Sequence, residues 1–278
     1  MYTILAACAG PSDDTAATDD TAVEVTDYVV TYTTDPDPPV AGQEATFTES
    51  VRDQADRPIE DLQTAHERVI HTLFISTDLT SFQHLHQEDF EALTAENLRN
   101  STFSFPVTFP MSGDYRVVYD FAHHDQYVTR QDWITVTGEP GQAAEPVLDY
   151  STENGDRDVV ATLTWDVEPY AGYEAAWTVH LTDTDGNDIT DVTQWLGSDG
   201  HAAVVSADLA FTSHTHAWFP GMEDLTPGHP MPQLYEGPDI PFHYTFPTAG
   251  AYKMWVQFAR TGAPDDPYVI DFSFDVAP

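Results

Sequence analysis

One segment of this 278-residue chain occurs twice. The pattern H-x6-D-L-x4-H-x-H begins at His71 and begins again at His201. A repeated unit restricts the fold, because each copy must bury a hydrophobic face of its own or pack that face against its copy. The first copy contains His71, Asp78, His84 and His86, and the second contains His201, Asp208, His214 and His216.

The repeat extends well beyond the histidines. Ahead of them, the sequence A-G-x-E-A occurs at Ala41 and at Ala171, with the same offset as the histidine pattern. Behind them, F-P-x-x-G-x-Y occurs at Phe109 and at Phe246, with an offset that is larger by seven. We therefore predict a tandem duplication of one domain, with seven extra residues in the Pro- and Gly-rich segment 218–241 of the second copy.

Short runs of β-branched and aromatic residues, such as 23–30 and 115–121, alternate with Gly- and Pro-rich turns. This pattern favours β-strands, and only 61–67 and 88–98 look helical. Each copy has the length of an immunoglobulin-like sandwich, and the tyrosine of F-P-x-x-G-x-Y is typical of the corner tyrosine of such sandwiches. The predicted fold is all-β: two tandem immunoglobulin-like β-sandwich domains that arose by internal duplication.

The domain boundaries follow from the repeat and from composition. We expect the first domain at 23–138, a linker at 139–146 and the second domain at 147–278. Residues 9–22 are small, polar and acidic, which predicts a disordered tether. No later stretch approaches the roughly 18 consecutive apolar residues of a membrane-spanning helix.

Cys8 is the single cysteine, which excludes an internal disulfide and a cysteine-based zinc site. It follows Leu5-Ala6-Ala7, a small-residue pattern that resembles a lipoprotein processing box. We expect residues 1–8 to be the remnant of a lipoprotein signal and Cys8 to carry the lipid. The protein would then lie at the extracellular face of the cell membrane, held there by this anchor alone. The alternative is a chance cysteine in a disordered N-terminus.

The chain is strongly acidic, with 9 basic and 47 acidic residues and a net charge of −38. Such a field repels nucleic acid and anionic membranes and concentrates cations. Two explanations compete: adaptation to high salt, and an acidic surface that collects metal ions. We favour salt adaptation, and a halophilic source, because the acidic residues are spread over the whole chain and Lys253 is the only lysine.

Residues 71–88 are predicted to form a β-hairpin with its turn at 78–81. His84 and His86 are two residues apart and therefore point to the same face of the returning strand. With the turn centred after residue 79, His71 pairs near residue 88 and lies diagonal to His86. A bulge or a twist is then needed to bring His84 to the other two imidazoles.

Three convergent imidazoles are the ligand set of many copper and zinc sites. Asp78 and Asp208 could orient an imidazole or serve as a weak ligand, but forming the turn is the role that we favour. The alternative is that the histidines are structural. Met222, His229, Met231 and His243 would suit reduced copper, although we favour a compact surface loop there. The proposed metal ligands are His71, His84, His86, His201, His214 and His216.

Both halves resemble a group of secreted or lipid-anchored immunoglobulin-like proteins that carry H…D-L…H-x-H-P followed by F-P-x-x-G-x-Y and a later phenylalanine. The similarity covers 42–121 and 172–258. The resemblance implies handling of heavy metals, copper in particular. This chain departs from the pattern where Gln87 and Ala217 replace the proline, which leaves the proposed ligands untouched.

The sequence contains no nucleophile elbow, phosphate loop or HExxH motif, so we do not expect an enzyme. The leading hypothesis is a cell-surface metal-binding protein, with copper first and zinc second, for sequestration, delivery or resistance. The alternative is a structural or adhesive lipoprotein that binds a protein or carbohydrate partner. Exposed aromatic residues at Trp218, Phe219 and Tyr235 would suit that alternative.

Overall fold

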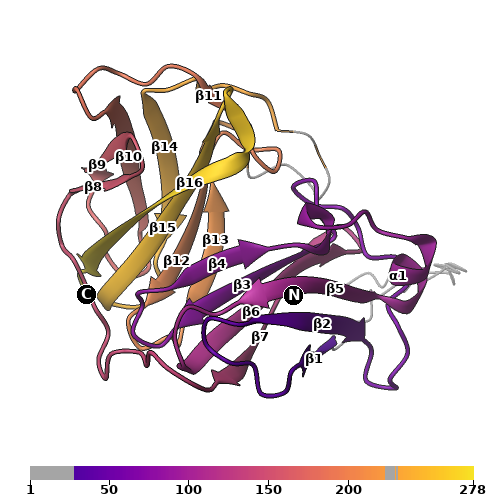
Figure 1. Cartoon of the computed structure of the whole chain (residues 1–278). Helices are drawn as coiled ribbons and strands as arrows, with labels where there is room; N and C mark the ends of the chain where they lie inside the picture. The colour runs from indigo at the N-terminus through magenta and orange to yellow at the C-terminus, as the bar shows by residue number, and fades with distance from the viewer. Residues whose placement is uncertain (1–27, 223–228, 230) are drawn as a thin grey trace, which may run out of the picture.

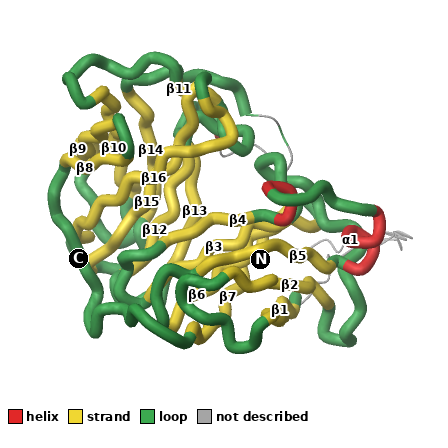
Figure 2. Tube along the Cα trace, in the orientation of Figure 1, coloured by secondary structure: helices red, strands yellow, loops and turns green. Residues whose placement is uncertain are grey.

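The computed structural model of the chain describes residues 28–222, 229 and 231–278. Strands dominate these residues, and their two helical segments, η1 (Gln87–Asp89) and α1 (Ala95–Asn100), both lie in the first half (Figure 2). The helix expected at 61–67 is wrong, because Ala65 and Arg68 exchange backbone hydrogen bonds in a tight turn. The helix expected at 88–98 is replaced by these two shorter segments. The all-β prediction is confirmed.

The first half is a sandwich of two antiparallel sheets (Figure 1). Phe47 and Phe74, one from each sheet, meet edge to face with ring centroids 5.0 Å apart in the core. One sheet contains β1 (Val29–Asp35), β2 (Glu44–Arg52) and β5 (Thr102–Thr108), in that order. The other contains β4 (Phe82–Leu85), β3 (Ile70–Ser76), β6 (Gly113–His123) and β7 (Gln126–Val136).

The second half repeats this plan around the buried Trp177. One sheet contains β14 (Asp239–Thr245), β10 (Glu174–Asp183), β9 (Val159–Val167) and β8 (Glu153–Asp156). In the other, β15 pairs with β12 and with β16, β12 also pairs with β13, and the short β11 adds to β15. These strands are β11 (Val192–Thr193), β12 (His201–Ser206), β13 (Thr212–His216), β15 (Gly250–Arg260) and β16 (Ala263–Val276).

Strand register confirms the duplication. Phe47 of β2 pairs with Phe105 of β5, and the equivalent Trp177 of β10 pairs with Phe242 of β14. The two corner tyrosines are also equivalent: each hydroxyl donates to the carbonyl oxygen four residues earlier, at 2.9 Å, in Tyr115 and in Tyr252. The chain is therefore two tandem immunoglobulin-like sandwiches, as the repeat predicts.

The two sandwiches pack against each other through the sheets that contain β3 and β12. Every residue of both strands is buried, because one face of each strand lies on its own core and the other on the opposite half. Phe82 stacks on Trp255 at this interdomain interface, with ring centroids 5.0 Å apart. One buried apolar cluster at this interface contains equivalent residues from both halves, as in a twofold dimer: Leu73 and Ala203, Ile75 and Val205, Leu79 and Leu209, and Val118 and Trp255.

The expected linker lies along the first hairpin turn. The backbone carbonyl of Asp78 accepts from Val147 N at 2.7 Å, and its Oδ2 accepts from Ala143 N at 2.8 Å. These contacts fix the path by which the chain leaves the first sandwich for the second. The predicted signal remnant, the tether and most of the strand expected at 23–30 lie outside the described residues. Within the described residues, none of the helices has the length and apolar character needed to cross a membrane.

Candidate metal centre

The register of the first hairpin places its histidines opposite one another. Leu73 pairs with His84 and Thr72 with Leu85, so the next position across from His71 is His86. In the second half, His201 pairs with His216 directly. The expected pairing of His71 with residue 88 is wrong by two residues. A shift of two keeps every side chain on its face, and no bulge is needed to bring the histidines together.

The turn is centred one residue earlier than expected, because Asp78 organises it. Asp78 Oδ1 accepts from Ser76 Oγ at 2.7 Å and from Thr80 N at 3.1 Å, and Leu79 takes a left-handed conformation with φ of 60°. Asp208 Oδ1 likewise accepts from Ser206 Oγ, at 2.6 Å. Both aspartates therefore bind atoms of their turns rather than lying among the imidazoles.

In the first half, three imidazole nitrogens converge on one point. His71 Nδ1 lies 2.9 Å from His86 Nε2 and 3.1 Å from His84 Nε2, and the latter two nitrogens are 3.1 Å apart. We call His71, His84 and His86 the first triad. Their side chains are 3%, 7% and 0% exposed, which closes this point to solvent.

The other nitrogen of each ring fixes the tautomer. Each outer nitrogen faces an oxygen that can only accept a hydrogen bond, so the ring proton must lie there and the inner nitrogen must present a lone pair. The three bonds are His71 Nε2 to Ala65 O at 2.9 Å, His84 Nδ1 to Gln257 Oε1 at 3.0 Å, and His86 Nδ1 to Asp89 Oδ2 at 2.7 Å. Metal-binding histidines are oriented in this way.

Burial keeps the first triad neutral. It lowers the pKa of His84 and of His86 to about 3, and it holds the pKa of His71 well below its usual value. Neutral imidazole is the form that binds a metal ion. Three inward lone pairs repel one another unless a cation lies between them. His71, His84 and His86 would hold such an ion, and their three inward nitrogens would supply it with neutral donors.

The second half builds a looser counterpart, the second triad, from His201, His214 and His216. His201 Nε2 donates to Trp195 O at 2.7 Å, and its Nδ1 lies 3.1 Å from His214 Nε2. The Nε2 of His216 is buried and has no hydrogen-bond partner among the described residues. Three residues after His216 the chain has Phe219, where Asp89 follows His86 in the first half. Among the described residues, no carboxylate is hydrogen-bonded to His216 as Asp89 is to His86.

The two triads form a single six-histidine centre at the interdomain interface. The rings of His84 and His214 lie 5.0 Å apart between centroids, and those of His71 and His214 lie 5.9 Å apart. One donor atom from each of His71, His84 and His214 falls within a mutual 4.8 Å, and so does one from each of His201, His214 and His216. The sequence predicts a triad in each domain, and the structure brings the two triads together.

His66 is a seventh histidine that the sequence motif does not include. Its ring stacks on that of His216 with centroids 3.8 Å apart, and its Nε2 lies 3.0 Å from the hydroxyl of Tyr127. Burial lowers its pKa to about 4. Because the equivalent residue is Leu196, the repeat contains no signal for this role.

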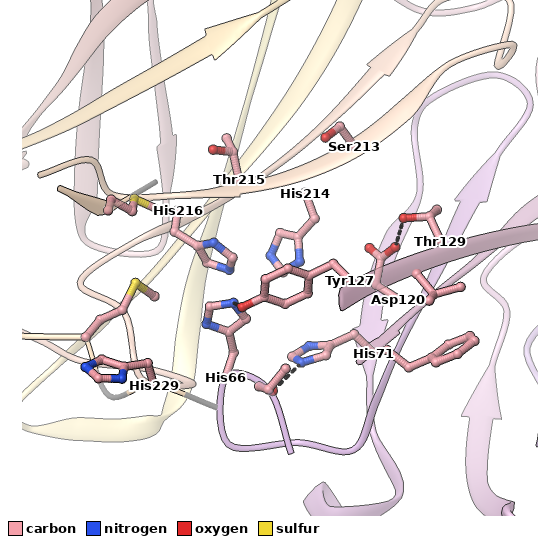
Figure 3. A pocket seen from close by; sticks show the side chains of 15 residues that line it. His66, His71, Asp120, Tyr127, Thr129, Ser213, His214, Thr215, His216 and His229 are labelled. Carbon is pink, nitrogen blue, oxygen red and sulfur yellow. Dashed lines mark hydrogen bonds between the residues drawn. The ribbon is translucent and has the colours of Figure 1, made fainter. Parts of the chain in front are cut away.

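A pocket of about 350 Å³ opens beside the second triad (Figure 3). Its lining includes His66, His71, His214 and His216, together with Asp120, Tyr127, Met222, His229 and Met231.

Asp120 is the buried carboxyl group of this pocket. Its Oδ1 accepts from Thr129 Oγ1 at 2.5 Å, and burial raises the pKa of Asp120 to about 6. Asp120 occupies the position equivalent to Gln257, which binds His84 on the other side of the centre. His243, which the sequence groups with Met222, His229 and Met231, does not line this pocket. Its ring stacks on that of Trp218, with centroids 4.0 Å apart.

A third group of possible ligands lies at the surface of the first half. His123 Nε2 lies 2.8 Å from Asp61 Oδ1, and the neighbouring His124 approaches Asp61 Oδ2 at 3.6 Å. In the second half, the equivalent of the Asp61–His123 contact is the ion pair between Asp191 and Arg260, also at 2.8 Å. An arginine cannot bind a metal ion, so the equivalence favours an ion pair in both halves.

Comparisons with known proteins agree with the repeated architecture. A family model described as "Domain of unknown function (DUF8832)" matches residues 23–138 and again 156–277. A search of curated proteins found no significant match.

Similar solved structures include surface proteins. The adhesin InvE of Yersinia pseudotuberculosis is 13% identical over 88% of this chain and 58% of the adhesin, with a TM-score of 0.23. The Escherichia coli adhesin FdeC is 15% identical over 90% of this chain and 64% of the adhesin, with a TM-score of 0.24. Domains 4 and 5 of the S-layer protein SbsC are 13% identical over 90% and 98%, with a TM-score of 0.23. The chain spans less than two thirds of either adhesin structure.

Proposed function

We propose that this chain, which belongs to the DUF8832 family of domains of unknown function, binds transition-metal ions in the six-histidine centre. One observation supports this above the others. The first triad directs three lone pairs at one buried point while each ring proton is bonded outward to an oxygen. Structural histidines gain stability by donating hydrogen bonds to one another, whereas these rings are arranged to accept a cation.

Copper is the first choice of ion and zinc the second. Neutral imidazole suits both ions, and three imidazoles are a common ligand set for either. The acidic surface would raise the local concentration of such cations, since the chain has a net charge of −38. We propose sequestration or delivery of the ion as the biological role. A position outside the cell, on a lipid at Cys8, stays part of this proposal.

The alternative is a structural or adhesive protein with a protein or carbohydrate partner. The adhesins and the S-layer domains above are proteins of that kind, which agrees with this alternative. Their TM-scores of 0.23 to 0.24 support no inference about a partner of this chain. The alternative gives no reason for three convergent lone pairs, so we rank it second.

The proposal is tested by titrating the full chain with Cu(II) and with Zn(II), using calorimetry at high salt. High salt screens the loose uptake of cations by an acidic surface. The wild-type protein is expected to show saturable binding, and the double variant His84→Ala/His86→Ala is expected to lose the binding of the first triad. His180→Ala is the matched control, because His180 is an exposed histidine that hydrogen-bonds Asp239 at 2.7 Å.

A wild-type chain without saturable binding of either metal would overturn the proposal. Equal affinity in the wild type and in a folded double variant, as judged by far-UV circular dichroism, would also overturn it. If the double variant folds but has lost metal binding at the first triad, the alternative in which these histidines are purely structural loses its support.

A further inference from the structure

We infer that the six-histidine centre binds two metal ions, one in each triad, and that the second ion exchanges more readily than the first. This inference rests on the proposed function, because it specifies how the same centre is occupied. Two neighbouring ions in one centre differ from two independent ions in separate domains, and also from a single ion that both halves bind.

Each triad has enough donor atoms of its own. The first supplies three inward nitrogens at 2.9–3.1 Å from one another. In the second, the facing nitrogens of His201 and His214 are 3.1 Å apart, and the unpartnered Nε2 of His216 completes the set. No nitrogen has to serve both triads, so the two ions do not compete for ligands.

The two ions would lie close together. A donor atom of His214 is within 4.8 Å of donor atoms of His71 and His84. With metal–nitrogen bonds of about 2 Å on either side, the ions can be at most about 9 Å apart. Two Cu(II) ions at such a distance interact magnetically, which separated copies of the same site do not.

Two cations so close together repel each other, and carboxylates lie where they reduce this cost. Asp89 binds His86 of the first triad at 2.7 Å. Asp120 lines the pocket beside His214 and His216. Each triad therefore has one carboxylate near it, and neither carboxylate has to be a direct ligand.

The triads differ in access and in support. The first is at most 7% exposed, and all three of its rings have outward hydrogen bonds. In the second, His214 and His216 are only partly buried and line the 350 Å³ pocket, where His66 stacks on His216. In Figure 3 the rings of His66, His71, His214 and His216 gather around this pocket. The first triad reaches the same pocket only through His71, which is 3% exposed. An ion in the second triad therefore has the more open path to solvent.

The test is electron paramagnetic resonance of the full chain with one and then two equivalents of Cu(II). The first equivalent is expected to give the spectrum of an isolated ion. The second is expected to broaden or reduce that spectrum and to produce a half-field transition. A chelator should then remove the two ions in two phases, with one phase at least tenfold faster. His216→Ala should bind one ion with an isolated spectrum and lose the fast phase, whereas His180→Ala should behave as the wild type.

Saturation at one ion per chain, or two ions with the spectra of isolated Cu(II), would overturn the inference and leave metal binding intact. Release of two coupled ions in a single phase would overturn the claim of unequal exchange. Absence of any bound metal would overturn the proposed function as well. The spectra of the wild-type chain decide between one and two ions even if His216→Ala fails to fold.

Discussion

The interiors of the two sandwiches differ in polarity although their strands are equivalent. In the first half, Thr72 Oγ1 donates to Glu49 Oε2 at 2.7 Å inside the core. The other oxygen of Glu49 and the hydroxyl of Tyr119 are buried without a hydrogen-bond partner in the part of the chain that the structure describes. The three equivalent residues of the second half are all apolar and fully buried: Val179, Ala202 and Val256.

This difference separates what the fold requires from what the histidine centre requires. The second half shows that the same strands pack around an apolar interior, so the polar group around Glu49 is not needed for the fold. The interdomain interface and the triads, in contrast, are built from equivalent residues on both sides. Burial of a carboxyl without a full set of partners costs stability unless the group is neutral. Accordingly, burial raises the pKa of Glu49 to about 8.

The largest predicted effect is a pH dependence that arises from Glu49, a buried carboxyl group without a counterpart in the second half. Glu49 binds its proton more tightly in the folded chain, with a pKa of about 8, than at its ordinary pKa of 4.5. Its contribution is therefore fully present below pH 4.5 and is lost as the pH rises through 8. Between these values the contribution of Glu49 to the free energy of unfolding should fall by up to about 1.4 kcal/mol per pH unit. Hydrogen exchange of β2 and β3, followed by mass spectrometry from pH 5 to 8, measures this local stability.

Glu49→Gln is the matched control, since the amide has a similar shape and no charge at any pH. The buried histidines of both halves, whose lowered pKa values favour the folded chain as the pH rises towards 6.5, act alike in both proteins. The difference between the wild type and Glu49→Gln therefore isolates Glu49, and it should appear in β2 and be absent from β10 of the second half. An identical slope in the wild type and in Glu49→Gln would show that another group is responsible.

A smaller effect is expected from Asp89, because within the described ranges only the first triad has a carboxylate hydrogen-bonded to one of its rings. Asp89→Asn removes the charge that orients His86, and such a loss typically weakens metal affinity by about 10- to 100-fold. Competition with a chelator should show the loss for the first ion and leave the second unchanged. Asp239→Asn is the control, because Asp239 makes the same 2.7 Å contact with the exposed His180. Equal losses for both ions in Asp89→Asn would mean that the triads do not differ as described.

The smallest effect concerns the aspartate pair in which the first half uses a histidine, His123, and the second half an arginine, Arg260. His123→Arg installs the residue that pairs with Asp191 in the second half, opposite an Asp61 whose pKa is lowered by its hydrogen bond with His123. His123 is buried and its Nδ1 lies 2.7 Å from the hydroxyl of Tyr28, whereas Asp61 is exposed. The arginine can keep the contact with Asp61 but displaces the contact with Tyr28, so the free energy of unfolding in urea should fall by about 1 kcal/mol. A loss well above that, beyond the loss in His123→Ala, would contradict the structural equivalence of the two pairs.

Much of the architecture can be predicted from the spacing of the repeat. Because the offset between the copies grows by seven only at the insertion, Phe47 and Phe105 map onto Trp177 and Phe242, which do pair. The corner tyrosines follow from the same alignment. The prediction that Asp78 forms the hairpin turn is confirmed, but the sequence pattern places the centre of the turn one residue late. Pattern alone does not reveal that Leu79 takes a left-handed conformation.

The repeat does not predict that the two triads meet, because this depends on which faces of the sandwiches pack together. The sequence of β3 does contain a signal that this strand lies between the two sandwiches. Its apolar residues Leu73, Phe74 and Ile75 follow one another without alternating with polar residues. A strand on the surface of a sandwich should alternate, and a continuous apolar run indicates burial on both faces. The role of His66 has no such signal, since the contact with His216 depends entirely on the interdomain arrangement.

The linker held by Asp78 has a further consequence. The two halves meet at an effective concentration set by a short tether, so their contact does not weaken on dilution as that of two separate chains would. In a symmetric homodimer every substitution appears twice. Within one chain, the two halves can carry different residues around the centre. His66 stacks on His216, whereas the residue equivalent to His66 is Leu196. Asp89 orients His86 in the first half, whereas the second half has Phe219 three residues after His216. Covalent fusion thus allows a nearly symmetric centre to have two different sides.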